Sequence, residues 1–452
     1  MDAAGSATPP ATPRFIDALR FWLKLGFVSF GGPAGQIAIM FRELVERRRW
    51  ISERRFLHAL NYCMVLPGPE AQQLATYIGW LLHRTWGGIA AGALFVLPSL
   101  FILVALAWIY ITYGDVPVVA GIFYGIKPAV TAIVLHAAWR IGGRVLKNAW
   151  LWSIAAAAFV AIFALKAPFP AIVAGAALLG WLGSRIDPGA FAVGGAHAKM
   201  HAQVAGRAVI DDDTPPPAHA RFTRARLAGV VAAGLVLWLG LIVLLAAAFG
   251  TTGLLAQMAW FFSKAALLTF GGAYAVLPYV YQGAVEHYGW LTALQMIDGL
   301  ALGETTPGPL IMVVAFVGFV GGWTHPLFGP AQLFWSGALA AAVVTLFTFL
   351  PSFIFIFAGG PLIESTHGDL RFTAPLTAIT AAVVGVIVNL ALFFAAHVLW
   401  PRGEVGTFGA AFEWPAALIT LAAAVALLRF KLDVLVVIGA SALLGLAWQF
   451  LA

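Results

Sequence analysis

The chain has 452 residues, of which 62% are hydrophobic and only 10% are charged. An ordinary soluble protein carries roughly 25% charged residues, so a water-soluble globule is excluded. The formal net charge of +7 does not indicate a nucleic-acid partner, because the basic residues cluster in short loops between apolar runs, as they do in the cytoplasmic loops of membrane proteins.

Apolar runs divide the chain into 13 hydrophobic segments. A run of about 20 apolar residues is long enough to cross the hydrocarbon core as a helix. We therefore predict an all-α polytopic membrane protein. The segments lie at 15–41, 56–83, 86–112, 117–146, 149–165, 169–183, 227–249, 254–281, 297–322, 331–358, 372–399, 414–428 and 431–451.

A polar stretch rich in Asp, Pro and Arg separates two groups of apolar segments and indicates a flexible linker. The predicted organisation is an N-terminal transport repeat (1–183), a cytoplasmic linker (184–226), an extra transmembrane helix (227–253) and a C-terminal transport repeat (254–452). His197 and His201 in the linker form a weak candidate for a metal clip, so we predict neither a metal site nor a cofactor.

Four short motifs recur in the same order in both halves, which indicates an internal duplication. The first three pairs share one constant offset in residue number, and the fourth pair has a slightly larger one. The pairs are Phe30-Gly31-Gly32 with Phe270-Gly271-Gly272, Trp50 with Trp290, Pro67-Gly68-Pro69 with Pro307-Gly308-Pro309, and Leu97-Pro98-Ser99 with Leu350-Pro351-Ser352.

The two repeats are predicted to have opposite orientations in the membrane. The loop after the first Gly-Gly motif contains six arginines between Arg42 and Arg55, whereas its counterpart at 282–296 contains no Lys or Arg. Under the positive-inside rule these loops lie on opposite sides of the membrane. The extra helix provides the additional crossing that inverts the second copy. Inverted repeats with broken or re-entrant helices are typical of transporters.

The Gly- and Pro-rich motifs break otherwise continuous apolar runs. Each break leaves helix ends whose free N–H groups and partial positive charge favour an anion, although glycines that merely allow close packing remain an alternative. The candidate substrate-binding residues in and beside the breaks are Gly31, Gly32, Gln36, Pro67, Gly68, Glu70, Gln72, Gln73, Gly271, Gly272, Thr305, Thr306 and Gly308.

Charged residues in these segments are further candidates. Lys24 and Lys264 lie at equivalent positions shortly before the Gly-Gly motif of their repeat, and we expect them to neutralise a doubly charged anion unless they extend to a nearby interface. Glu70 and Glu304 are candidates for proton coupling, with capping of a helix dipole as the alternative for Glu70. Lys127 is a weaker candidate for the anion path.

The motifs Phe30-Gly31-Gly32-Pro33, Leu66-Pro67-Gly68-Pro69-Glu70 with Gln73, Thr269-Phe270-Gly271-Gly272 and Thr306-Pro307-Gly308-Pro309 resemble those of the chromate ion transporter family in its long, two-domain form. The resemblance covers nearly the whole chain. It implies antiparallel halves and a multi-pass inner-membrane protein that exports chromate, driven by the membrane potential or a proton gradient. Sulfate is isosteric with chromate, so the resemblance supports the identity of the substrate less strongly than it supports the fold.

We therefore hypothesise a secondary transporter for a tetrahedral oxyanion, most simply chromate. A sulfate-type uptake or exchange carrier and an anion channel remain alternatives. No Walker A, HExxH or GxSxG motif occurs, so we expect neither ATP-driven transport nor an enzyme. The expected partners are the oxyanion and the lipid bilayer, and no nucleic acid is expected. The sequence leaves undecided whether the protein forms a homodimer.

Overall fold

A computed structural model describes residues 10–30, 32–191, 207–212, 214, 215, 217–365, 373–401, 403, 405 and 412–451. These residues form 16 α-helices and no β-strand beyond an isolated bridge between Ile51 and Ile210. The α-helices are α1 (Phe15–Val28), α2 (Gly32–Phe41), α3 (Glu53–Val65), α4 (Glu70–Tyr113), α5 (Pro117–Val145), α6 (Ala149–Phe163), α7 (Phe169–Ile186), α8 (Arg224–Phe249), α9 (Leu254–Leu267), α10 (Ala273–Tyr281), α11 (Ala293–Thr305), α12 (Val313–Thr324), α13 (Leu333–Ser365), α14 (Thr373–Leu399), α15 (Trp414–Leu428) and α16 (Val434–Leu451).

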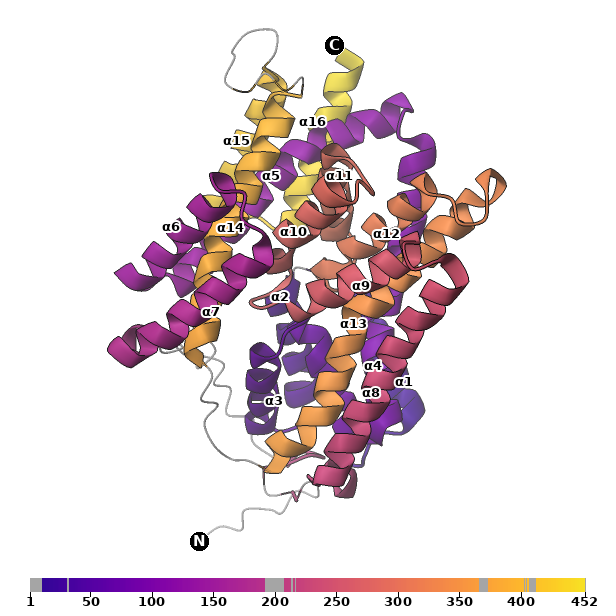
Figure 1. Cartoon of the computed structure of the whole chain (residues 1–452), viewed down its shortest axis with the longest axis vertical. Helices are drawn as coiled ribbons and strands as arrows, with labels where there is room; N and C mark the ends of the chain where they lie inside the picture. Colours follow the sequence, from indigo (N-terminus) through magenta and orange to yellow (C-terminus); the bar gives the residue numbers. More distant parts are fainter. Residues whose placement is uncertain are drawn as a thin grey trace.

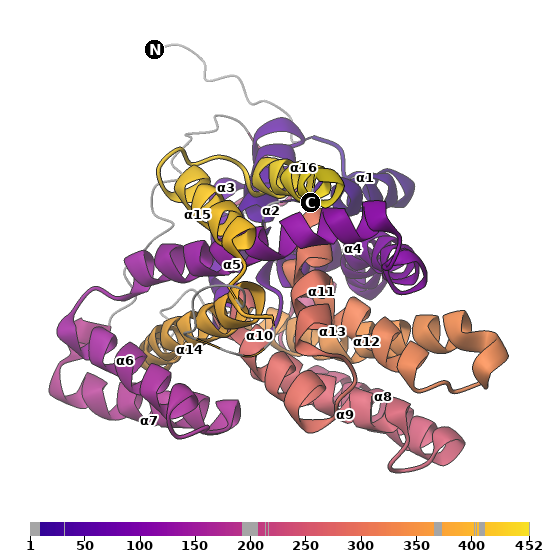
Figure 2. The same ribbon diagram turned by 90° about the horizontal axis from the view of Figure 1, so that it is seen from above.

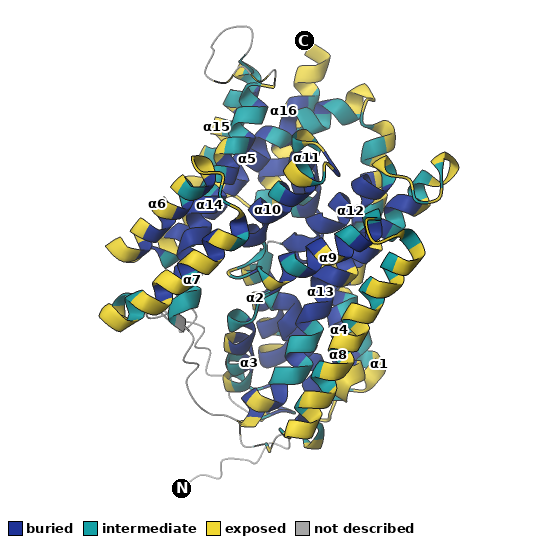
Figure 3. Ribbon diagram, in the orientation of Figure 1, coloured by how far each residue is buried: buried dark blue, intermediate teal, exposed yellow. Residues whose placement is uncertain are grey.

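Seven of the helices are long and apolar enough to cross a membrane, which confirms the prediction of an all-α polytopic membrane protein. Their outward faces carry apolar side chains: α8, the predicted extra helix, has no buried residue, and Val236 and Val243 on it are 73% and 65% exposed. Figure 3 shows buried residues gathered in the centre and exposed ones on the outer faces of α6, α7 and α8. Lipid is the solvent that suits such faces.

The order of elements repeats along the chain. Helices α1, α2 and α3 correspond to α9, α10 and α11, and the helices from α5 to α7 correspond to α14, α15 and α16. Short π-helical turns at Arg42–Arg47 and Gln282–His287 are related by the same offset as the Gly-Gly motifs. Helix α4 corresponds to α12 and α13 together, because α4 is kinked at His83 and Arg84 where the second copy has a loop.

The predicted breaks fall where the structure separates helices. The apolar segments 15–41, 254–281 and 297–322 each contain two helices. The segment 56–83 contains α3 and the first part of α4, and the predicted boundary after residue 83 is the kink inside α4 rather than the end of a helix.

The two repeats are interlocked rather than side by side. Helix α5 of the first repeat packs on α15 and α16, and α14 of the second repeat packs in the same way on α6 and α7 (Figure 2). Figure 1 shows α3 in the lower half of the molecule and its counterpart α11 in the upper half. This placement agrees with repeats of opposite orientation.

The described part of the linker packs against the end of the molecule where α3 begins. The Ser52 N–H donates to the Ile210 carbonyl oxygen at 2.9 Å, and the ring Nε2 of His219 lies 2.8 Å from the Trp80 carbonyl oxygen. The candidate metal clip of His197 and His201 lies outside the described residues.

Candidate functional site

The two Pro-Gly-Pro loops meet at the centre of the molecule through reciprocal hydrogen bonds. The Gly68 N–H donates to the Thr269 carbonyl oxygen at 2.8 Å, and the Gly308 N–H donates to the Ser29 carbonyl oxygen at 2.7 Å. The two donors occupy equivalent positions in the repeats, and so do the two acceptors, so a pseudo-two-fold axis relates the two bonds. Each loop is therefore held by the segment that precedes the Gly-Gly motif of the other repeat.

The glycines of these loops are required by both conformation and space. Gly68 has φ of +123° and Gly308 has φ of +112°, values that side-chain-bearing residues rarely adopt. A Cβ atom on Gly68 would lie 2.5 Å from Ser352 Oγ, and one on Gly308 would lie 2.7 Å from the Cβ of Ser99. The Leu-Pro-Ser motifs thus pack against the Pro-Gly-Pro loops of the opposite repeat, which explains why the two motifs recur together.

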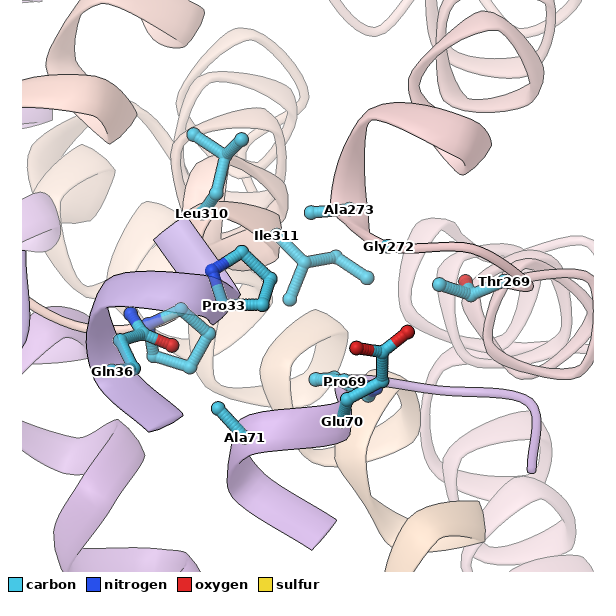
Figure 4. A pocket seen from close by; sticks show the side chains of 11 residues that line it. Pro33, Gln36, Pro69, Glu70, Ala71, Thr269, Gly272, Ala273, Leu310 and Ile311 are labelled. Atoms are coloured by element: carbon cyan, nitrogen blue, oxygen red, sulfur yellow. The ribbon is translucent and has the colours of Figure 1, made fainter. Parts of the chain in front are cut away.

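A small pocket lies between these loops (Figure 4). Eleven residues line it, and eight of them form four pairs at equivalent positions of the two repeats, so the pocket lies on the pseudo-two-fold axis. The lining residues are Pro33, Gln36, Pro69, Glu70, Ala71, Thr269, Gly272, Ala273, Pro309, Leu310 and Ile311.

Four helical segments begin at this pocket. Pro33, Glu70, Ala273 and Leu310 each lie in the first turn of α2, α4, α10 and the 3₁₀ turn (Leu310–Met312) that leads into α12. The first N–H groups of a helix have no partner within it, and they carry a partial positive charge. The Gly-Gly and Pro-Gly-Pro breaks therefore surround the pocket with N–H groups that suit an oxyanion.

Glu70 is the ionisable residue among those lining the pocket. Its carboxyl group points into the space beside Gly272 and Ile311 (Figure 4), and within the described residues it has neither a hydrogen bond nor an ion pair from its side chain. Gln36 connects the repeats, because its Nε2 donates to the Gly308 carbonyl oxygen at 2.7 Å.

The other predicted binding residues lie behind the pocket or in its loops. Their side-chain donors are hydrogen-bonded there, whereas Oε1 of Gln72 and Oε1 of Gln73 are buried without a hydrogen-bond partner among the described residues. Gln73 Nε2 donates to the Pro67 carbonyl oxygen and to Ser352 Oγ, and Gln72 Nε2 donates to Thr76 Oγ1. The hydroxyl groups of Thr305 and Thr306 donate to carbonyl oxygens of their own helix. They support the walls without lining the cavity.

Of the four glycines in the two Gly-Gly motifs, Gly272 lines the pocket and has φ of +99°. Gly32 and Gly271 flank the lining residues Pro33 and Gly272, and Gly31 lies outside the described residues.

The two lysines predicted to neutralise the anion are not among the lining residues. Lys24 is exposed on the outer face of α1. Lys264 is half-buried, and its Nζ lies 5.7 Å from the ring centroid of the exposed Trp260. Glu304 accepts a hydrogen bond from the hydroxyl of Tyr274 on α10, also outside the lining.

Two buried ionic networks connect the repeats, and the sequence reasoning missed both. Glu364 of α13 pairs with Arg55 of α3 at 2.7 Å, and Asp298 of α11 lies 3.4 Å from Lys127 of α5. For Asp298 the available signal was an acidic residue within a predicted apolar segment, whereas Glu364 lies beyond the predicted segment 331–358. That signal was applied only beside the Pro-Gly-Pro motifs.

Interlocked repeats with broken helices and a central pocket are typical of polytopic membrane transporters. The chain belongs to the chromate transporter family, whose model matches residues 16–181 and 256–446. This confirms the resemblance inferred from the motifs.

Three relatives match most of the chain. The chromate transport protein of Pseudomonas aeruginosa is 33% identical over 85% of this chain and 82% of its own. That of Cupriavidus metallidurans is 29% identical over 98% and 96%. A probable chromate transport protein of Synechococcus elongatus is 28% identical over 90% and 93%. No solved structure matches the chain.

Proposed function

We propose that this chain is a secondary transporter that exports chromate across the inner membrane through the pocket on the pseudo-two-fold axis. The observation that supports this most is the meeting of four helix N-termini in one pocket between inverted repeats. The family and the names of the relatives support chromate as the cargo. Sulfate has the same shape and charge, so a sulfate carrier is the second candidate.

In this proposal the charge of the anion is balanced by helix ends rather than by the two lysines. Free N–H groups of α2, α4, α10 and the turn before α12 bind the oxygens, and the repeats move so that the pocket opens to each side in turn. At an interior potential of about −100 mV, each negative charge that is expelled gains about 2.3 kcal/mol, so export needs no ATP.

Glu70 makes anion binding depend on a proton. A dianion about 4 Å from an ionised carboxylate is repelled by about 8 kcal/mol at an effective dielectric constant of about 20. Protonating a carboxyl group of ordinary acidity at pH 7 costs about 4 kcal/mol. Because the repulsion is larger, Glu70 is protonated when the anion binds, and a net charge of −1 moves. The potential then contributes about 2.3 kcal/mol per 100 mV.

Flux into proteoliposomes tests the site. We expect saturable chromate transport that a membrane potential accelerates. Ala273→Leu fills the pocket, at a cost of about 1–3 kcal/mol, and lowers transport by about fivefold or more. Ala34→Leu makes the same change on the exposed face of α2 and leaves transport unchanged. Equal flux in the two variants, or flux that does not saturate, contradicts the proposal.

Two further measurements separate the alternatives. Chromate and sulfate are compared as cargo and as competitors, and preferential sulfate transport supports the second candidate. Glu70→Gln removes the pocket proton, so each chromate should carry two net charges across the membrane rather than one. The flux should therefore depend more steeply on the membrane potential. An unchanged potential dependence removes Glu70 from the proton step.

A further inference from the structure

Asp298 lies in a buried network that joins the two repeats away from the pocket. Its side chain is 2% exposed. The hydroxyl of Tyr110 on α4 donates to Asp298 Oδ2 at 2.8 Å, and Nζ of Lys127 on α5 lies 3.4 Å from the same oxygen. Asp298 belongs to the second repeat and both partners belong to the first.

The network is incomplete. Asp298 Oδ1 is buried and has no hydrogen-bond partner among the described residues. The distance to Lys127 is also long, since ionised N–H···O bonds usually measure about 2.7–2.9 Å. A buried acceptor without a partner costs about 1–3 kcal/mol, and more when it is charged. The carboxylate is therefore poorly stabilised as an anion in this conformation.

The second buried network provides the contrast. In Glu364, Oε1 accepts from the hydroxyl of Tyr77 at 2.5 Å and Oε2 accepts from Arg55 at 2.7 Å. Both carboxylate oxygens have partners, so this network is complete and serves to hold α3 on α13. Each network combines a carboxylate, a tyrosine and a basic side chain, but only the one on α11 leaves an oxygen free.

Few other ionisable groups surround Asp298. Helices α12 and α16, which also pack on α11, contain no ionisable side chain, and α14 contributes only His397, whose Nδ1 is bonded to the Phe393 carbonyl oxygen. Asp115 lies in the exposed loop between α4 and α5. The charge of Asp298 is thus set by Lys127 and Tyr110.

The position of the network connects it to the transport path. Asp298 lies two turns of helix, about 10 Å, before the end of α11, which leads directly into the second Pro-Gly-Pro loop. Lys127 lies three turns, about 15 Å, from the start of α5, with 27% of its side chain exposed. A change at Asp298 therefore reaches both the loop of the pocket and the packing between the repeats.

We propose that Asp298 is a proton-binding site of the transport cycle, separate from the pocket. A proton from water binds the carboxylate as the contact with Lys127 opens, and it returns to water when the pair forms again. Lys127 keeps its own proton throughout. The proposal rests on the proposed function only in that this proton binds and leaves, on one side of the membrane, during the cycle that moves the anion.

Infrared spectroscopy of the purified protein tests the site without transport. Spectra recorded across a pH titration should contain a protonated-carboxyl band that is lost in Asp298→Asn and retained in Asp115→Asn, the same change at a nearby exposed position. If Asp298→Asn does not fold, Lys127→Met with Asp298→Asn replaces the ion pair by a neutral pair and is compared in the same way. A band that is unchanged in both variants overturns the proposal.

A second measurement follows chromate flux in proteoliposomes with the same pH on both sides. The flux of Asp298→Asn should change less with pH than that of Asp115→Asn, and the two variants should depend equally on the membrane potential, because the proton of Asp298 returns to the side from which it came. An equal pH dependence in the two Asp variants overturns the proposal. Absence of chromate flux in the unmodified protein counts against the proposed function instead, and the infrared result then still decides about Asp298.

Discussion

Substituting alanine at the two Pro-Gly-Pro glycines tests whether the reciprocal loops at the centre of the molecule control transport. Gly68 and Gly308 occupy equivalent positions, but their surroundings differ. The Cβ of Gly68→Ala would approach Ser352 Oγ at 2.5 Å and Gln73 Nε2 at 2.7 Å, both ends of side chains. The Cβ of Gly308→Ala would approach the Cβ of Ser99 at 2.7 Å, an atom fixed to the backbone.

The expected cost has two parts. A side chain at a positive φ costs roughly 1–2 kcal/mol, and the steric conflict costs about 1–3 kcal/mol because the surrounding core is closely packed. Each alanine variant should therefore raise the free energy of the native loop by about 2–5 kcal/mol. Since a factor of ten corresponds to about 1.4 kcal/mol, chromate affinity or flux should fall by at least tenfold.

Second-site substitutions separate the cost of the positive φ from the steric cost. Ser352→Ala removes the hydroxyl that conflicts with Gly68→Ala, so the double variant should recover much of the steric cost and retain the cost of φ. Ser99→Ala leaves the conflicting Cβ in place, so only Ser99→Gly should restore the Gly308→Ala protein.

The assay combines thermal unfolding in detergent with chromate flux in proteoliposomes. Gly143→Ala in α5 is the control, because no atom lies within 4 Å of the position its Cβ would take. Full activity and stability of Gly68→Ala would refute the reasoning, as would equal restoration of Gly308→Ala by Ser99→Ala and by Ser99→Gly.

Three other outcomes follow from the structure. Lys24→Ala combined with Lys264→Ala should retain chromate flux in proteoliposomes, and a large loss would return the lysines to the anion path. Arg55→Gln should destabilise the protein by about 3–5 kcal/mol in unfolding measurements, because it leaves Glu364 without its cation; unchanged stability would contradict this. Burial lowers the pKa of His219 below its ordinary value of 6.5, so docking of the linker should be fully stable above pH 6.5 and weaken as the pH falls through the lowered pKa. Limited proteolysis should then cut the linker faster at low pH in the unmodified protein but not in His219→Gln, and equal pH dependence would exclude His219.

The sequence was sufficient to predict the repeat and the breaks, and the breaks meet at the pocket proposed as the site. Duplicated Phe-Gly-Gly and Pro-Gly-Pro motifs locate the ends of helices regardless of how the helices pack, because Gly and Pro act on the backbone locally. The inverted orientation was predicted from the arginines between Arg42 and Arg55. The exchange of α5 and α14 between the repeats left no such signal, since both helices are apolar on most of their faces.

Individual side chains were harder to predict, because the direction of a residue depends on packing. Lys24 and Lys264 match in sequence position, yet neither reaches the pocket between the repeats. Glu70 was identified because it directly follows a break and so must lie at a helix start. Asp298 could be noticed as an acid within an apolar segment, but nothing in the sequence shows that Lys127, in the other repeat, lies beside it.

The residues that differ between the repeats are as informative as those that recur. If both halves were identical, exchange of their conformations would give two states of equal energy, opening to opposite sides. Leu310 replaces Glu70 in the second half, and Asp298 has His58 as its counterpart in the first. At each of these positions only one of the two repeats carries an acid, so protonation changes the energies of the two states unequally. Under the proposed function, this asymmetry of the acids lets protonation favour one of the two states of an otherwise symmetric scaffold.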